Sequence, residues 1–241
     1  MSRELLAVDQ VSMIFGGLRA LDDVSFSVGS GEIVGLIGPN GAGKTTLFNV
    51  VSGYCRPSRG RVRFDGKDVT GQRPFHLARL GIARTFQIVK PFAGLTVLEN
   101  VTVACLLHHP RRRHARQKAW EILEFTGLAE RAGRPASGLT LAGRKRLEIA
   151  KALSLNPRLL LLDEVVAGLN PTEADRTIEL ILNIHRSGVS ILIVEHIMRV
   201  IMNISDRVAV LNYGAKIAEG PPQQVAQDPG VIEAYLGEAA A

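Results

Sequence analysis

Residues 38–45 read Gly38-Pro39-Asn40-Gly41-Ala42-Gly43-Lys44-Thr45, a full match to the pattern G-x-x-x-x-G-K-[ST]. The segment follows an apolar, strand-like run at residues 32–37 and precedes a helical pattern that ends near Gly53. Its glycines allow the backbone N–H groups to curl around a phosphate, and the helix start adds its positive end. We call residues 38–45 the phosphate loop.

The phosphate loop predicts a site for a nucleoside triphosphate and Mg²⁺. Lys44 is expected to reach the β- and γ-phosphates, and the Thr45 hydroxyl is expected to ligate the metal. A glycine-rich turn without a ligand is the alternative, which the strand-loop-helix context disfavours. The predicted nucleotide-binding residues of this segment are Gly38, Pro39, Asn40, Gly41, Ala42, Gly43, Lys44, Thr45 and Thr46.

A second motif of chemical interest is the acid pair, Asp163 and Glu164, which directly follows the apolar run at residues 159–162. Such a run is typical of a strand buried on both faces, and open α/β sheets bind ligands beyond the carboxyl ends of their strands. Asp163 is therefore expected to hold Mg²⁺ through water, and Glu164 to act as general base. On its own, a strand that ends in two acids is more often a solvated strand end than a functional site. Together with the phosphate loop, the acid pair is better explained as part of the nucleotide site.

The order of apolar patterns predicts an α/β fold, with a mostly parallel sheet covered on both sides by helices. Residues 96–128 are helical and basic in pattern, and they read as an inserted helical subdomain. Asn170 is expected to cap a helix that begins at Pro171. The predicted strands are residues 5–15, 24–28, 32–37, 61–65, 82–86, 159–162 and 191–194, followed by a hairpin of residues 208–211 and 216–218, and a further helix is predicted at residues 144–155.

Composition narrows the class of protein. The chain has 241 residues, 46% of them apolar, which suits one folded domain and excludes a disordered or collagen-like chain. Two cysteines exclude a disulfide scaffold, and no apolar run approaches the roughly 20 residues of a membrane span. The net charge of +6 is consistent with binding to nucleic acid, to an anionic membrane face or to an anionic ligand. These features and the lack of a secretion signal predict a cytoplasmic protein.

Beyond these motifs, the whole chain resembles the nucleotide-binding subunits of ATP-binding-cassette (ABC) transporters. Gln87, in Thr85-Phe86-Gln87, stands where that family places a glutamine that contacts Mg²⁺ or the attacking water, and His196 stands at its switch histidine. Residues 167–170 stand at its dimer-contacting loop. The resemblance implies a P-loop ABC nucleotide-binding domain over residues 1–241. It also implies an antiparallel β subdomain, a helical subdomain at about 88–155 and a C-terminal hairpin and helix at about 206–241.

Two further sites follow from the resemblance. Phe15 stands at the family's position for an aromatic ring that stacks on adenine, with a core phenylalanine as the alternative. The signature segment, which acts on the ATP of the opposite subunit, matches the family's Leu-Ser-Gly-Gly-Gln only in part, because Ala142 replaces a glycine and Gly143 the glutamine. The added Cβ is expected to hinder the approach to phosphate. The segment comprises Leu139, Thr140, Leu141, Ala142 and Gly143.

Residues 81–87, 95–101, 167–173 and 231–237 resemble the ATPase subunits of branched-chain (hydrophobic) amino-acid importers, whose relatives import urea or short amides. The resemblance implies an ATPase at the inner face of the cell membrane. Its implied partners are a second ATPase, commonly different and so forming a heterodimer, with a homodimer as the alternative, two membrane permeases, and a periplasmic or extracellular solute-binding protein. A soluble ABC ATPase on DNA or ribosomes, or a non-hydrolysing regulator, remains as a competing class.

The run His108-His109-Pro110-Arg111-Arg112-Arg113-His114 is basic enough to suggest a zinc or nucleic-acid site. It has no cysteine nearby, no interleaved aromatic residue, and a proline that interrupts the helix. We therefore expect a solvated basic loop and no nucleic-acid partner.

Overall fold

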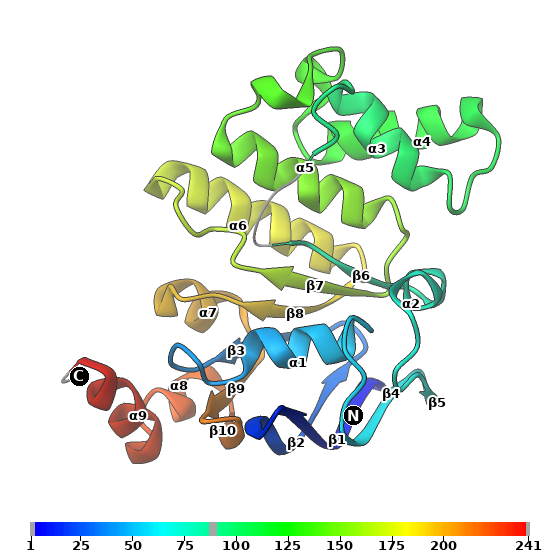
Figure 1. The fold of residues 1–241 in the computed structure, drawn as a ribbon. Coiled ribbons are helices and arrows are strands. Elements are labelled where there is room, and N and C mark those ends of the chain that lie inside the picture. Colours follow the sequence, from blue (N-terminus) through cyan, green and yellow to red (C-terminus); the bar gives the residue numbers. More distant parts are fainter. Residues whose placement is uncertain (1–2, 87–90, 240–241) are drawn as a thin grey trace.

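The computed structural model describes residues 3–86 and 91–239, and it contains two sheets with helices around them (Figure 1). In this part of the chain the larger sheet has the strand order β10-β9-β3-β8-β7-β6. Strands β6, β7, β8, β3 and β9 run parallel, and β10 pairs antiparallel with β9. These strands are β3 (Ile33–Ile37), β6 (Ile82–Arg84), β7 (Leu159–Asp163), β8 (Ser190–Val194), β9 (Arg207–Asn212) and β10 (Ala215–Gly220).

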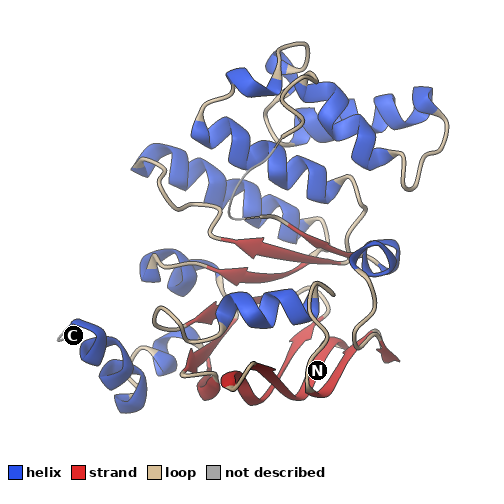
Figure 2. Cartoon of the chain, viewed as in Figure 1, coloured by secondary structure: helices blue, strands red, loops and turns tan. Residues whose placement is uncertain are grey.

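The central strands are buried on both faces, as their continuous apolar runs predict. In β7, Leu159 and Leu161 pack into one core, whereas Leu160 and Leu162 pack into another on the opposite face. The core on the first face includes residues of α1 (Lys44–Val51) and of the smaller, antiparallel sheet. The core on the opposite face includes residues of helices α5 (Leu141–Leu153), α6 (Pro171–Arg186) and α7 (Met198–Ile204). Figure 2 shows this layering of helices and strands.

The second sheet is antiparallel, with the order β2-β1-β4-β5, and it covers α1. Its strands are β1 (Glu4–Phe15), β2 (Leu18–Gly29), β4 (Arg59–Phe64) and β5 (Lys67–Asp68). Strand β2 begins well before the predicted residues 24–28, because its pairing with β1 continues to the Phe15–Leu18 pair. Helix α2 (Pro74–Leu80) and helix α7 escaped prediction, since seven residues give too few turns for a clear helical period.

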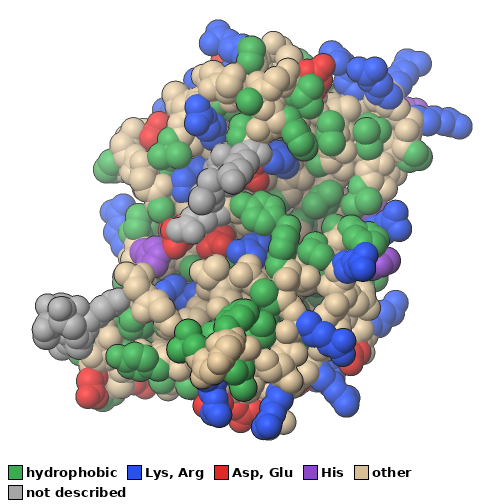
Figure 3. All heavy atoms as spheres, in the orientation of Figure 1, with side chains coloured by type: hydrophobic (Ala, Val, Ile, Leu, Met, Phe, Trp, Pro, Cys, Tyr) green, Lys and Arg blue, Asp and Glu red, His purple; other side chains and the backbone are tan. Residues whose placement is uncertain are grey.

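A third core joins α3 (Val97–Cys105), α4 (Arg112–Phe125) and α5, and it contains Leu98, Leu123 and Leu147. The predicted helical pattern of residues 96–128 is thus confirmed, with Thr96 and Glu99 forming a capping box at the start of α3. The basic run is only partly a loop, since α4 begins at Arg112. Its residues are exposed except for His109, which is half-buried, and Figure 3 shows Lys and Arg side chains projecting from the corner where α4 lies in Figure 1.

The chain ends in the predicted hairpin, β9 and β10, followed by α8 (Pro222–Val225) and α9 (Pro229–Ala239). Asn170 caps α6 as predicted, and Glu173 completes a capping box with it. No helix in the described ranges is long and apolar enough to cross a membrane. Because β3, β7 and β8 are parallel, their carboxyl ends meet at one edge of the sheet, and this edge carries the predicted site.

Candidate functional site

The phosphate loop lies between β3 and α1, and its backbone requires glycine at two positions. Gly38 has φ 149°, and a Cβ there would lie 2.1 Å from the Leu211 carbonyl oxygen. Gly43 has φ 102°, and its Cβ would lie 2.6 Å from the Ala20 carbonyl oxygen. The loop is therefore closed in by β9 and β2, which hold its backbone in a curled form suited to surround an anion.

Lys44 is buried at the start of α1, and its ammonium group turns back onto the loop. Nζ donates hydrogen bonds to the carbonyl oxygens of Gly38 at 2.6 Å and Pro39 at 2.8 Å. These contacts hold a positive charge inside the curl of the loop. A phosphate group that enters the loop offers this ammonium a charged acceptor in place of two neutral ones.

A pocket of about 630 Å³ opens over the loop, within the usual range for small-molecule sites. Its lining contains ten of the predicted site residues, whereas Leu18, Arg19, Ala20 and Tyr213 were not predicted. Phe15 is 47% exposed and Tyr213 is 89% exposed, so both rings are free to meet a ligand. The predicted residues in the lining are Phe15, Asn40, Gly41, Ala42, Gly43, Lys44, Thr45, Thr46, Glu164 and His196.

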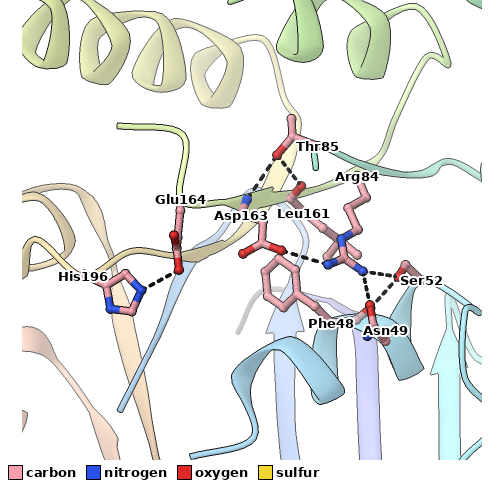
Figure 4. A network of polar contacts seen from close by, with 9 residues as sticks. All are labelled: Phe48, Asn49, Ser52, Arg84, Thr85, Leu161, Asp163, Glu164 and His196. Carbon is pink, nitrogen blue, oxygen red and sulfur yellow. Dashed lines mark hydrogen bonds and ion pairs between the residues drawn. The ribbon is translucent and has the colours of Figure 1, made fainter. Parts of the chain in front are cut away.

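The two members of the acid pair contact different partners (Figure 4). Glu164 has φ 51°, and its Oε1 lies 2.5 Å from His196 Nε2 at the edge of the pocket. Asp163 is the last residue of β7 and is buried, and its Oδ2 accepts a hydrogen bond of 2.8 Å from Arg84 Nη2. The structure thus brings Glu164 and His196, distant in sequence, into direct contact beside the phosphate loop.

Two buried charged residues that the sequence did not single out lie behind the acid pair. Lys145, on α5, donates a hydrogen bond from Nζ to the Glu164 carbonyl oxygen, and burial lowers its pKa against the opposing effect of Glu195. Burial raises the pKa of Glu195 to about 7, although its Oε1 accepts a 2.8 Å hydrogen bond from the Val166 N–H. Lys145 thus joins α5, and Glu195 the end of β8, to the backbone of the loop after β7.

The signature segment lies outside the pocket lining, at the start of α5. Thr140 caps this helix by accepting a 3.2 Å hydrogen bond from the Gly143 N–H. Helix α5 therefore begins at Leu141, three residues before the predicted Arg144, and includes Ala142 and Gly143 in its first turn. Gln87 lies outside the described residues.

The described residues contain no group of three or more His, Cys, Asp or Glu side chains that could hold a metal by themselves. Oxygen ligands are nevertheless present, because Thr45 lines the pocket and the Asp163 carboxylate lies at the end of β7. Mg²⁺ is usually bound by one or two such groups together with phosphate oxygens. The residues therefore fit a magnesium ion that arrives with a nucleotide.

Known proteins resemble this chain over nearly its whole length. The ABC transporter family model matches residues 21–167, and the model described as branched-chain amino acid ATP-binding cassette transporter matches residues 215–241. The chain is 42% identical to the high-affinity branched-chain amino acid transport ATP-binding protein BraF of Pseudomonas aeruginosa. It is also 42% identical to the protein LivG, described in the same words, of Escherichia coli K12. Each alignment covers 99% of this chain and 100% of the relative.

Among solved structures, the ADP conformation of an ATP-binding cassette of an ABC transporter matches with a TM-score of 0.89 and 35% identity. The match covers 98% of this chain and 100% of that one. A nucleotide-free ATP-binding cassette matches with the same TM-score and identity, over 96% of this chain and 98% of the other. The chain therefore belongs to the ABC transporter family, as an ATP-binding cassette of the branched-chain amino acid type.

Proposed function

We propose that this chain binds and hydrolyses ATP and thereby powers a membrane importer of branched-chain amino acids. One observation carries the proposal: the phosphate loop after β3, Glu164 after β7 and His196 after β8 line a single pocket. The pocket offers a cation and N–H groups for phosphates, together with a carboxylate for water. Phosphoryl transfer needs little more than such positioning and charge stabilisation.

In the proposed reaction, the phosphate loop and Lys44 hold the triphosphate, and Phe15 stacks on the adenine ring. The Glu164 carboxylate, which the backbone turns toward the pocket, accepts the proton of the attacking water. His196, at 2.5 Å from that carboxylate, orients it and hydrogen-bonds the γ-phosphate. Gln87 is proposed to contact the attacking water or the metal and to report on the membrane partner.

Thr45 and Asp163 are the residues proposed to hold Mg²⁺, with Asp163 acting through water. When bound, the ion would neutralise charge on the phosphate oxygens. The Thr45 hydroxyl at the start of α1 would be a direct ligand and Asp163 at the end of β7 would act through a bound water, while the remaining ligands would come from the nucleotide and water.

The signature segment lies outside the lining of this chain's own pocket, which supports a composite site built from two ATPase chains. We propose that Leu139, Thr140, Leu141, Ala142 and Gly143 act on the ATP of the partner, and that the partner's segment closes over Lys44. The pair would be a heterodimer, peripheral on the cytoplasmic face of the membrane. It would act with two permease subunits and a periplasmic or extracellular solute-binding protein.

The direct test is reconstitution of the chain with its second ATPase and permeases in liposomes. We expect ATP hydrolysis that rises when the solute-binding protein is loaded with leucine, isoleucine or valine. Lys44→Ala removes the buried cation of the loop and is expected to abolish ATP binding and this stimulation. Lys118→Ala removes an exposed lysine that pairs with Glu121 on α4, and it is the control expected to leave both unchanged.

Two results would contradict the proposal. Stimulation only by urea or a short amide would assign another solute. Recovery of ribosomes or DNA, without polytopic membrane subunits, from a pull-down out of detergent-solubilised membranes would place the chain among the soluble ABC ATPases.

A further inference from the structure

Arg84 joins three elements at a buried position beside the site (Figure 4). It is the last residue of β6, and Nη2 contacts Asp163 Oδ2 of β7 at 2.8 Å. Nη1 donates to two side chains of the α1 region, Asn49 Oδ1 at 2.6 Å and Ser52 Oγ at 3.1 Å. The Arg84 and Asp163 side chains are 9% and 6% exposed, so solvent screens this ion pair far less than a surface pair.

Aromatic rings enclose the same guanidinium. Its central carbon lies 5.5 Å from the centroid of Phe48, 5.9 Å from that of Tyr54 and 5.6 Å from that of Phe86. Such contacts stabilise a cation and limit its movement. Arg84 is therefore held by α1 and by the rings, and it presents a fixed donor to Asp163.

Neighbouring residues of one strand end fix both the backbone and the side chain of Asp163. Thr85 Oγ1 accepts a 3.1 Å hydrogen bond from the Asp163 N–H, and Arg84 binds the carboxylate oxygen Oδ2. In Figure 4 the other carboxylate oxygen of Asp163 points away from Arg84. One oxygen is thus engaged, and the other keeps a defined direction.

We propose that Arg84 is a positioning residue for Mg²⁺ binding, which orients the Asp163 carboxylate toward the metal that accompanies ATP. The inference rests on the proposed function, because it assumes that Asp163 serves Mg²⁺. The direction in which Mg²⁺ affinity changes when Arg84 is removed depends on which role Arg84 has. A nearby positive charge alone repels Mg²⁺, so removing Arg84 would strengthen metal binding if orientation contributed nothing. If orientation of the Asp163 carboxylate dominates, removing Arg84 weakens Mg²⁺ binding.

The test measures the affinity of the full-length chain for a fluorescent ATP analogue, once in excess Mg²⁺ and once in EDTA. The quantity of interest is the gain in affinity that Mg²⁺ gives. We expect Arg84→Met to reduce this gain about tenfold, the size expected for a charge-assisted hydrogen bond, and to leave the affinity in EDTA unchanged. Arg84→Lys keeps the charge but not the fork that reaches Asp163 and Asn49 together, so it should restore the gain in part.

Arg158 provides a matched control at the opposite end of β7. Its guanidinium pairs with Asp65 at 2.8 Å and lies 5.5 Å from the Phe64 ring, so it makes the same two kinds of contact as Arg84, although its side chain is 48% exposed. Arg158→Met should therefore leave the magnesium gain unchanged. If Arg84→Met does not fold, Asn49→Ala removes only the 2.6 Å support from α1 and should produce a smaller loss of the gain.

An unchanged or larger magnesium gain in Arg84→Met would overturn the proposal, and so would unchanged gains in both Arg84→Lys and Asn49→Ala. A wild-type chain that binds the analogue but shows no magnesium gain would refute the metal role of Asp163, and the role of Arg84 with it. A wild-type chain that fails to bind the analogue would refute the proposed function itself. The three failures are thus distinguishable.

Discussion

At the scale of single residues, the site depends on backbone conformations that send neighbouring side chains in different directions. Asp163 continues β7 into the core, whereas Glu164 adopts φ 51° and contacts His196. A non-glycine residue in this region costs on the order of 1 kcal/mol. The hydrogen bond that Lys145 donates to the Glu164 carbonyl oxygen supports this conformation from α5.

The phosphate loop and the acid pair could be predicted because each is a local pattern with a defined spacing. Arg84, Lys145 and Glu195 could not be, because their partners come from other elements and only the strand order brings them together. Arg84 lies within residues 81–87, one of the segments that resemble the importer ATPases, yet nothing local indicates that it binds Asp163.

Glu195 makes the folded state sensitive to pH. Its folded-state pKa of about 7 exceeds the ordinary value of 4.5, so the folded chain binds this proton more tightly than the unfolded chain. The resulting stabilisation is present below pH 4.5 and is lost as the pH rises to about 7. Glu195→Gln cannot ionise and keeps an acceptor for the Val166 N–H. We expect it to raise the free energy of unfolding by about 1–3 kcal/mol at pH 8, and by little near pH 4.5.

Urea unfolding of the wild-type chain and of Glu195→Gln across this pH range measures the effect. The other titrating groups contribute equally to both proteins, so they cancel in the difference between the two free energies of unfolding. Glu121→Gln, an exposed change on α4, is the control and should show no such trend. A difference between Glu195→Gln and wild type that stays constant with pH would contradict the burial argument.

At the scale of elements, α5 connects the signature segment to the loop that carries Glu164. Its first turn carries the signature segment, and Lys145, one turn later, contacts the loop after β7. The sequence pattern predicts that this helix begins at Arg144, because the preceding Thr140 and Gly143 favour a loop. In the structure Thr140 acts as the N-cap, which starts the helix earlier.

Ala142 stands where the family signature has glycine, and this difference predicts that the two ATP sites of the proposed dimer hydrolyse ATP at different rates. Its Cβ lies in the first turn of α5, where backbone N–H groups would approach the partner's phosphate. In a complex that carries Glu164→Gln, only the partner's ATP site hydrolyses, and we expect Ala142→Gly to raise its single-turnover rate severalfold. Ala104→Gly on α3 is the control for loss of helix propensity. A rate equal to that of the unmodified signature would count against the asymmetry.

At the scale of the whole molecule, parallel strands gather the site at one edge of the larger sheet. The register places Val194 beside both Asp163 and Leu36, so the segments after β3, β7 and β8 emerge together. The sequence predicted this class of sheet from its apolar runs, but the strand order came only from the structure. The second sheet covers one face of the larger sheet, and helices α5, α6 and α7 cover the other.

The most direct measurement concerns Glu164 in the assembled transporter. The complex contains the partner ATPase with its own catalytic acid changed to glutamine, so only the pocket of this chain hydrolyses ATP. Glu164→Gln is expected to lower the single-turnover rate at least about a hundredfold, as removal of a general base does, while ATP still binds and holds the dimer closed. Glu121→Gln should leave the rate unchanged. A Glu164→Gln rate equal to that of the unmodified chain would contradict the account.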